Sequence, residues 1–200
     1  MKEPQKLSPK KQGDLDSRLI EAAYHGNTET VKVLLASGAN VHAEDDLALR
    51  CAAYDGYTEM VKVLLASGAN VHAKDDEALC WAAMNGHTEM VRTLLAGSAH
   101  VHAEDDCALR RAAYWGHTET VQILAAHIFS PDSWRGKSRI AIEAYASTLY
   151  DKIKVNVPQP ERLGIVRTIL LDCALTCWEQ VRPLPPPLTI SSLPAQPRPL

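Results

Sequence analysis

The sequence lacks any apolar run long enough to cross a membrane. Its longest apolar stretch, residues 163–178, is interrupted by Arg167 and Asp172, whereas a bilayer span needs about 18 or more apolar residues. The N-terminal residues MKEPQKLSPKKQGD also lack the continuous apolar segment of a secretory signal peptide. We therefore predict no membrane segment and no export by that route.

Motifs typical of common catalytic sites are absent as well. There is no Gly-rich phosphate loop, no G-x-S-x-G elbow and no H-E-x-x-H zinc motif. Paired aspartates recur at 45–46, 75–76 and 105–106, a repetition that a single active site does not need but that helix capping explains. We predict that the protein is not an enzyme and has no cofactor and no small-molecule substrate.

The cysteines do not show the short spacings of a disulfide framework. Their number is odd, which favours buried thiols in a reducing compartment over cross-links. We therefore expect a cytoplasmic protein, with nuclear targeting through the basic segment KLSPKK as an alternative. The five cysteines are Cys51, Cys80, Cys107, Cys173 and Cys177.

The net charge of −3 is unevenly distributed along the chain. Residues 1–13 carry +3, residues 14–128 carry −9 and residues 129–200 carry +3. A strongly acidic segment repels phosphate backbones, so we predict no nucleic-acid binding and a protein partner with a basic surface.

A repeat of 30 residues organises the middle of the chain. VHAEDD at 41–46 recurs as VHAKDD at 71–76 and as VHAEDD at 101–106. Residues 41–70 and 71–100 share 18 of 30 positions, a partial copy precedes them, and a fourth copy begins at residue 101.

Within each copy, two groups of apolar residues at helical spacing flank a glycine. In the best-defined copy we expect Asp46 to cap the first helix, Gly56 to end it and Gly68 to end the second helix. Such a pair is too short to bury its apolar stripe alone, so the copies must stack on one another.

The segment ALRCAAYDGYTEMVKVLLASGANVHAKDD, residues 48–76, resembles the ankyrin repeat. The resemblance covers about residues 14–128. These units are shorter than the usual ankyrin repeat of about 33 residues and lack its T-P-L-H start, so they are similar to a shortened 30-residue variety. The resemblance implies an all-α solenoid of four helix pairs that binds a partner protein on its concave surface.

The flanking segments do not follow the repeat. We predict a disordered basic N-terminus at 1–13, a C-terminal helical cap at 129–182 and a proline-rich disordered tail at 183–200. Within the cap, residues 138–154 and 160–181 have the pattern of two amphipathic helices.

Candidate binding residues are those that vary while the scaffold around them repeats. Tyr and Trp among them bury a large area at low entropic cost, which makes them good interface anchors. An alternative is that the Tyr, Met, Tyr stripe only packs between neighbouring first helices. The predicted protein-binding residues are Tyr24, His25, Glu44, Leu47, Tyr54, Asp55, Lys74, Glu77, Met84, Asn85, Glu104, Cys107, Tyr114 and Trp115.

The first alternative to a protein-binding module is a metal site. His42, His72 and His102 recur once per repeat, but equivalent residues of stacked repeats lie roughly 8 to 10 Å apart, too far to share a metal ion. We therefore predict hydrogen bonds within turns and no metal site, with His100 and His102 beside Asp105 and Asp106 as the metal alternative.

The second alternative is a ubiquitin-ligase-type adaptor. Residues 163–181 and the prolines after them resemble a SOCS box, although Arg167 stands where that element has a cysteine.

Overall fold

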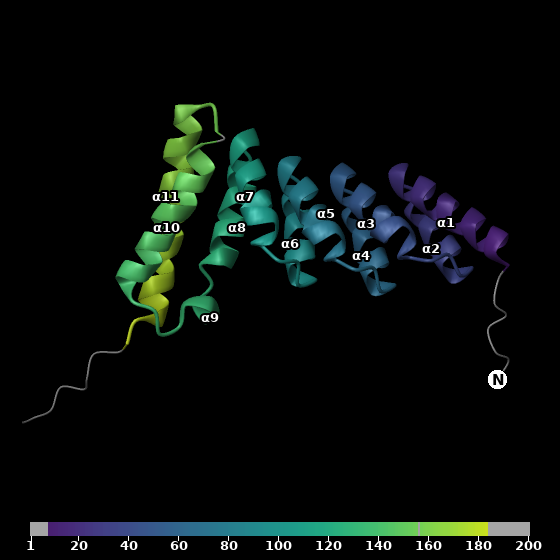
Figure 1. Ribbon diagram of the computed structural model, residues 1–200, viewed down its shortest axis with the longest axis horizontal. Coiled ribbons are helices and arrows are strands. Elements are labelled where there is room, and N and C mark those ends of the chain that lie inside the picture. The colour runs from purple at the N-terminus through teal and green to yellow at the C-terminus, as the bar shows by residue number, and fades with distance from the viewer. Residues whose placement is uncertain (1–7, 156, 184–200) are drawn as a thin grey trace, which may run out of the picture.

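A computed structural model describes residues 8–155 and 157–183 of the chain (Figure 1). These residues form helices joined by short turns, and they contain no strand. The helices are α1 (Pro9–Tyr24), α2 (Thr28–Ala36), α3 (Ala43–Asp55), α4 (Thr58–Ala66), α5 (Ala73–Met84), α6 (Thr88–Ala96), α7 (Ala103–Trp115), α8 (Thr118–Ile128), α9 (Pro131–Trp134), α10 (Arg139–Lys154) and α11 (Pro160–Val181).

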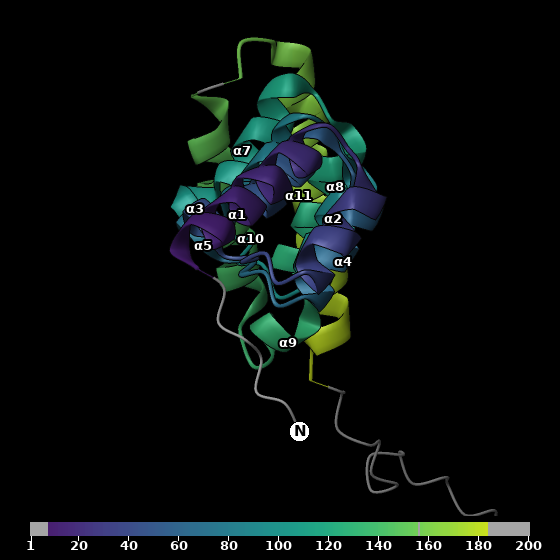
Figure 2. The same ribbon diagram turned by 90° about the vertical axis from the view of Figure 1, so that its right-hand side faces the viewer.

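The first eight helices form four stacked pairs. The first members of the pairs, α1, α3, α5 and α7, pack side by side in one layer, the first-helix layer (Figure 1). The second members α2, α4, α6 and α8 form the other layer, which is clearest when the stack is viewed from its end (Figure 2). The predicted all-α repeat solenoid is therefore confirmed.

The N-terminal prediction needs one correction. Helix α1 begins at Pro9, so residues 9–13 are helical and not disordered as we had predicted. Pro9 suits the first turn of a helix, where its missing amide hydrogen has no partner to lose. Residues 1–7 lie outside the described part of the chain.

The core between the layers is built from the repeating apolar positions. Leu49 of α3 and Leu64 of α4 are fully buried, as are the residues that correspond to them in the next two pairs. Ala52 and Ala53 are also fully buried, and their small side chains let α3 lie close to its neighbours.

A glycine ends α3, as predicted. Gly56 has φ of +80°, a left-handed conformation that costs glycine little. A side chain there would also collide with the ring of His87, since a Cβ would lie 2.8 Å from it. The Nε2 of His87 is 3.0 Å from the carbonyl oxygen of Tyr54, which links this turn to the next pair.

The acidic turn works differently from our prediction. Residues 44–46 all have positive φ, and Asp46 does not cap α3 with its side chain. Its buried carboxylate instead accepts a hydrogen bond of 2.7 Å from the amide of Asn70 in the following repeat. Asp16 and Asp76 do the same for Asn40 and His100, at 2.6 and 2.8 Å. We call Asp16, Asp46 and Asp76 the junction aspartates.

Three helices follow the repeats. Helix α10 packs beside α7, and α11 packs against α8 and closes the end of the stack (Figures 1 and 2). Their positions match the two amphipathic stretches, whereas the short helix α9 was not predicted; Trp134 fixes it by donating to the carbonyl oxygen of Ile128 at 2.9 Å. The predicted proline-rich tail lies outside the described residues from 184 onward. None of the described helices has the length and apolar character that a membrane crossing requires.

The turn after α6 carries a strained serine. Ser98 has φ of +72°, where the other repeats have Gly38 and Gly68, while Gly97 has φ of −78°. We expect the double substitution Gly97→Ser with Ser98→Gly to stabilise the protein by about 0.5 to 1 kcal/mol, because it returns glycine to the left-handed position. Urea denaturation would measure this gain, and a loss of stability would contradict it.

Candidate protein-binding surface

All fourteen predicted binding residues lie on or directly after helices of the first-helix layer, and none is buried. Nine of them are exposed and five are half-buried. The half-buried residues are Leu47, Glu77, Met84, Asn85 and Cys107. The exposed residues are Tyr24, His25, Glu44, Tyr54, Asp55, Lys74, Glu104, Tyr114 and Trp115.

Exposed aromatic side chains mark the ends of three first helices. Tyr24, Tyr54 and Tyr114 are 62%, 46% and 40% exposed, and Trp115 is 55% exposed. The rings of Tyr114 and Trp115 meet edge to face, with their centroids 5.3 Å apart. Tyrosine and tryptophan in such positions contribute strongly to binding when a partner covers them.

The backbone beside Tyr114 and Trp115 is held in place by a residue of the C-terminal helices. Nη1 of Arg162, on α11, donates a hydrogen bond of 2.5 Å to the backbone carbonyl of Tyr114. The same guanidinium packs against Gly116, where a Cβ would lie 2.9 Å from it. This contact fixes the backbone beside Trp115 without using either aromatic side chain.

The stripe of Tyr54, Met84 and Tyr114 runs across three first helices, and its middle residue is packed against a neighbour. Met84 is half-buried, and its sulfur accepts a hydrogen bond of 2.9 Å from Nη1 of Arg111 on the next first helix. Asn85 is likewise engaged, because its amide nitrogen donates to the carbonyl oxygen of Tyr54 at 2.9 Å. At these two positions the packing alternative describes the residues better than a free binding surface does.

Charged side chains cross between neighbouring repeats on this layer. Arg50 pairs with Glu77 at 2.5 Å, and Lys74 pairs with Asp45 at 2.7 Å. The hydrogen bond and the charge of Lys74 hold the pKa of the Asp45 carboxyl below its usual value. The Asp45 carboxyl therefore remains ionised at neutral pH, although Lys74 pairs with it locally.

Cys107 requires a correction. We predicted five free thiols, but Cys80 of α5 and Cys107 of α7 form a disulfide, with their Cα atoms 5.8 Å apart. Stacking sets a residue beside the one 27 positions later, the same spacing that joins Arg50 to Glu77. The prediction of free thiols is therefore wrong for Cys80 and Cys107, while the cytoplasmic location stays a prediction.

Trp81 was missed by the sequence reasoning. It is half-buried on α5, its ring meets that of Tyr54 edge to face at 5.7 Å, and the guanidinium of Arg50 lies 5.9 Å from its centroid. A signal was present, since the position directly before the double alanine also varies between repeats. The residues at that position are Glu21, Cys51, Trp81 and Arg111.

The recurring histidines stabilise turns, as predicted. Nδ1 of His42, His72 and His102 lies 3.1, 3.1 and 2.7 Å from a carboxylate oxygen of the aspartate four residues later. The metal alternative placed His100 and His102 together beside Asp105 and Asp106, but the two histidines contact different aspartates. His102 bonds to Asp106, whereas Nδ1 of His100 lies 3.6 Å from Asp76 of the preceding repeat.

Comparison with known proteins agrees with this architecture. A family model described as "Ankyrin repeats (3 copies)" matches residues 5–75 and 72–133, which together make up more than half of the chain. The chain belongs to the ankyrin repeat family. No curated protein matches it. Ankyrin repeats are generally protein–protein interaction modules, and the exposed aromatic residues of this ankyrin array lie on one of its two layers.

Proposed function

We propose that this ankyrin protein binds a partner protein on the first-helix layer, with Tyr114 and Trp115 as its anchors. The observation that carries the proposal is the exposure of these two side chains beside a backbone that Arg162 already fixes. A surface that is ordered before binding loses less conformational entropy when a partner covers it.

The partner proposed here has a basic contact surface. Residues 14–128 carry a net charge of −9. Complementary charges speed diffusional encounter, and salt screens this attraction. The acidic array that carries the aromatic anchors therefore suits a partner that presents Lys or Arg around an apolar centre.

Affinity purification followed by mass spectrometry would identify the partner, and the double variant Tyr114→Ala with Trp115→Ala would test the surface. We expect the dissociation constant to rise about tenfold or more, because both interface anchors are lost. Isothermal titration calorimetry would measure this change, and circular dichroism would check that the helix content is retained.

The matched controls are Lys32→Ala and Lys62→Ala in the second-helix layer. Each lysine is exposed and, within the described part of the chain, its one ion pair is with a glutamate three residues earlier on its own helix, at 2.7 and 2.8 Å. We expect these variants to leave the affinity nearly unchanged. A partner that ignores the aromatic pair but is lost on removal of residues 160–200 would contradict the proposed surface and favour the adaptor alternative.

A further inference from the structure

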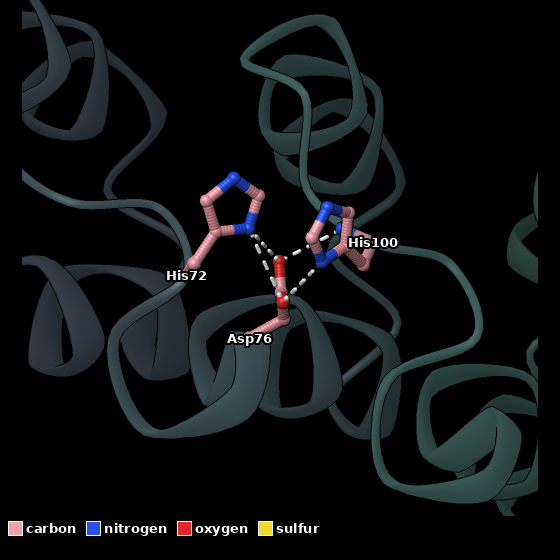
Figure 3. A group of neighbouring side chains, drawn as sticks. All are labelled: His72, Asp76 and His100. Atoms are coloured by element: carbon pink, nitrogen blue, oxygen red, sulfur yellow. Dashed lines mark hydrogen bonds and ion pairs between the residues drawn. The ribbon is translucent and has the colours of Figure 1, made fainter.

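Two histidines from successive repeats converge on one buried carboxylate. His72 directly precedes α5, Asp76 lies in the left-handed first turn of α5, and His100 comes from the loop of the next repeat (Figure 3). Asp76 is only 3% exposed, whereas the two histidine side chains are partly or largely open to solvent. One ligand atom from each of the three residues can be chosen so that all lie within 4.8 Å of one another.

We propose that His72, Asp76 and His100 bind a divalent transition-metal ion, and that Zn²⁺ fits the site. Two imidazole nitrogens and one carboxylate oxygen form a donor set that zinc uses in proteins. The exposed side of His100 leaves a fourth position open to water, as in other zinc sites with three protein ligands.

The distances fit this coordination. Tetrahedral ligands with bonds of about 2.0 Å lie roughly 3.3 Å from one another. Oδ2 of Asp76 is 3.3 Å from Nδ1 of His72 and 3.6 Å from Nδ1 of His100. Oδ1 accepts the backbone amide of His100 at 2.8 Å, which holds the carboxylate in place. Oδ1 also lies 3.1 Å from Nδ1 of His72, whereas Oδ2 is the oxygen that lies near both rings (Figure 3).

The rings themselves are already close. His72 and His100 stack with centroids 4.1 Å apart and planes inclined by 27°. Metal binding at both Nδ1 atoms needs imidazoles that carry their proton on Nε2, which leaves the Nδ1 lone pairs for the metal. The surrounding array adds an attraction for cations through its net charge of −9.

The neighbouring repeats show that this site is a departure from the scaffold. The equivalent turns place Asn40 and Asn70 where the site has His100, and each asparagine accepts a hydrogen bond from the amide two residues later. Among the described residues, the His100 side chain accepts no bond of this kind, so this turn lacks the hydrogen bond that the asparagines make in the other two turns. At the last turn, Asp106 instead accepts a hydrogen bond of 3.2 Å from the ammonium of Lys152.

The proposal revises the absence of metal that the sequence predicted. Equivalent histidines of stacked repeats lie too far apart to share a metal ion. His72 and His100 are not equivalent: they are 28 positions apart, and the loop of one repeat reaches back to the turn of the repeat before it.

The test is titration of the full chain with ZnCl₂ alone, without reductant, followed by isothermal titration calorimetry and by NMR of the histidine side chains. We expect a single equivalent to bind and to shift the imidazole resonances of His72 and His100. The variant His100→Asn restores the residue of the other repeats, so it should fold normally while losing zinc affinity by roughly a hundredfold or more.

A second variant should create a new zinc site in the preceding repeat. Asn70→His recreates the same group around His42 and Asp46, whose atoms are arranged in the same way at 3.1 and 3.3 Å, and it should bind a second equivalent. Zinc binding that is absent in the natural chain, unchanged in His100→Asn, or confined to other histidines in the NMR spectrum would overturn the proposal. Failure of Asn70→His to gain a second equivalent would also count against the geometry on which it rests.

Discussion

Replacing Asp46 by alanine should destabilise the protein by about 3 kcal/mol. The buried Asp46 carboxylate accepts a hydrogen bond from the Asn70 amide at 2.7 Å and another from His42 at 3.1 Å. Hydrogen bonds to charged groups contribute about 1.5 to 3 kcal/mol each, and the loss of Asp46 leaves the amide of Asn70 without this acceptor. Chemical denaturation monitored by circular dichroism would measure the loss.

Asp45→Ala is the control for the backbone. Asp45 and Asp46 have nearly the same left-handed φ, 56° and 57°, so alanine carries a similar conformational cost at either position. Asp45 is exposed, and its side chain only pairs with Lys74 on the surface, which contributes little. We expect a loss of about 1 kcal/mol or less, and equal losses in the two variants would show that the bond to Asn70 contributes nothing.

Features that depend on neighbours along the chain could be predicted from this sequence. The helix pairs follow from apolar residues at helical spacing, and the turn at Gly56 follows from a glycine at the end of that pattern. The 30-residue period then implied stacking, because one pair alone cannot bury its apolar stripe. These inferences needed no knowledge of how one repeat sits on the next.

Features that depend on the offset between repeats could not be predicted. Asp46 acts on Asn70, which is 24 residues away, and Cys80 meets Cys107 at a separation of 27. Both offsets differ from the period of 30, because the contacts join different positions of successive repeats. A comparison of equivalent positions alone therefore misses the junction aspartates, the disulfide and the convergence on Asp76.

The exposure of the candidate binding residues could be predicted only in part from the sequence. Variation between repeats identified Tyr114 and Trp115, which are exposed, because a scaffold position that varies is free of the demands of the core. The same criterion also selected Met84 and Cys107, whose side chains contact the adjacent first helix. Variation alone does not separate a free surface from a contact that differs between junctions.

The C-terminal helices should contribute to stability through the apolar face of α10. Ile142 is completely buried and belongs to the core that continues from the repeats, with Leu149 and Ile153 on the same helix. We expect Ile142→Ala to destabilise the protein by about 3 kcal/mol, within the usual range of about 2 to 5 kcal/mol for truncating a buried isoleucine or leucine. Urea denaturation would measure the loss.

The matched control lies two residues away on the same helix. Ile140 is 79% exposed, so Ile140→Ala removes the same atoms with almost no change in buried area, and we expect an effect within about 0.5 kcal/mol. Because α10 packs beside α7, the loss in Ile142→Ala should appear in the unfolding of the whole array and not only of its end. If helix α10 unfolds in a separate transition while the repeats retain their stability, the C-terminal helices do not stabilise the ankyrin array.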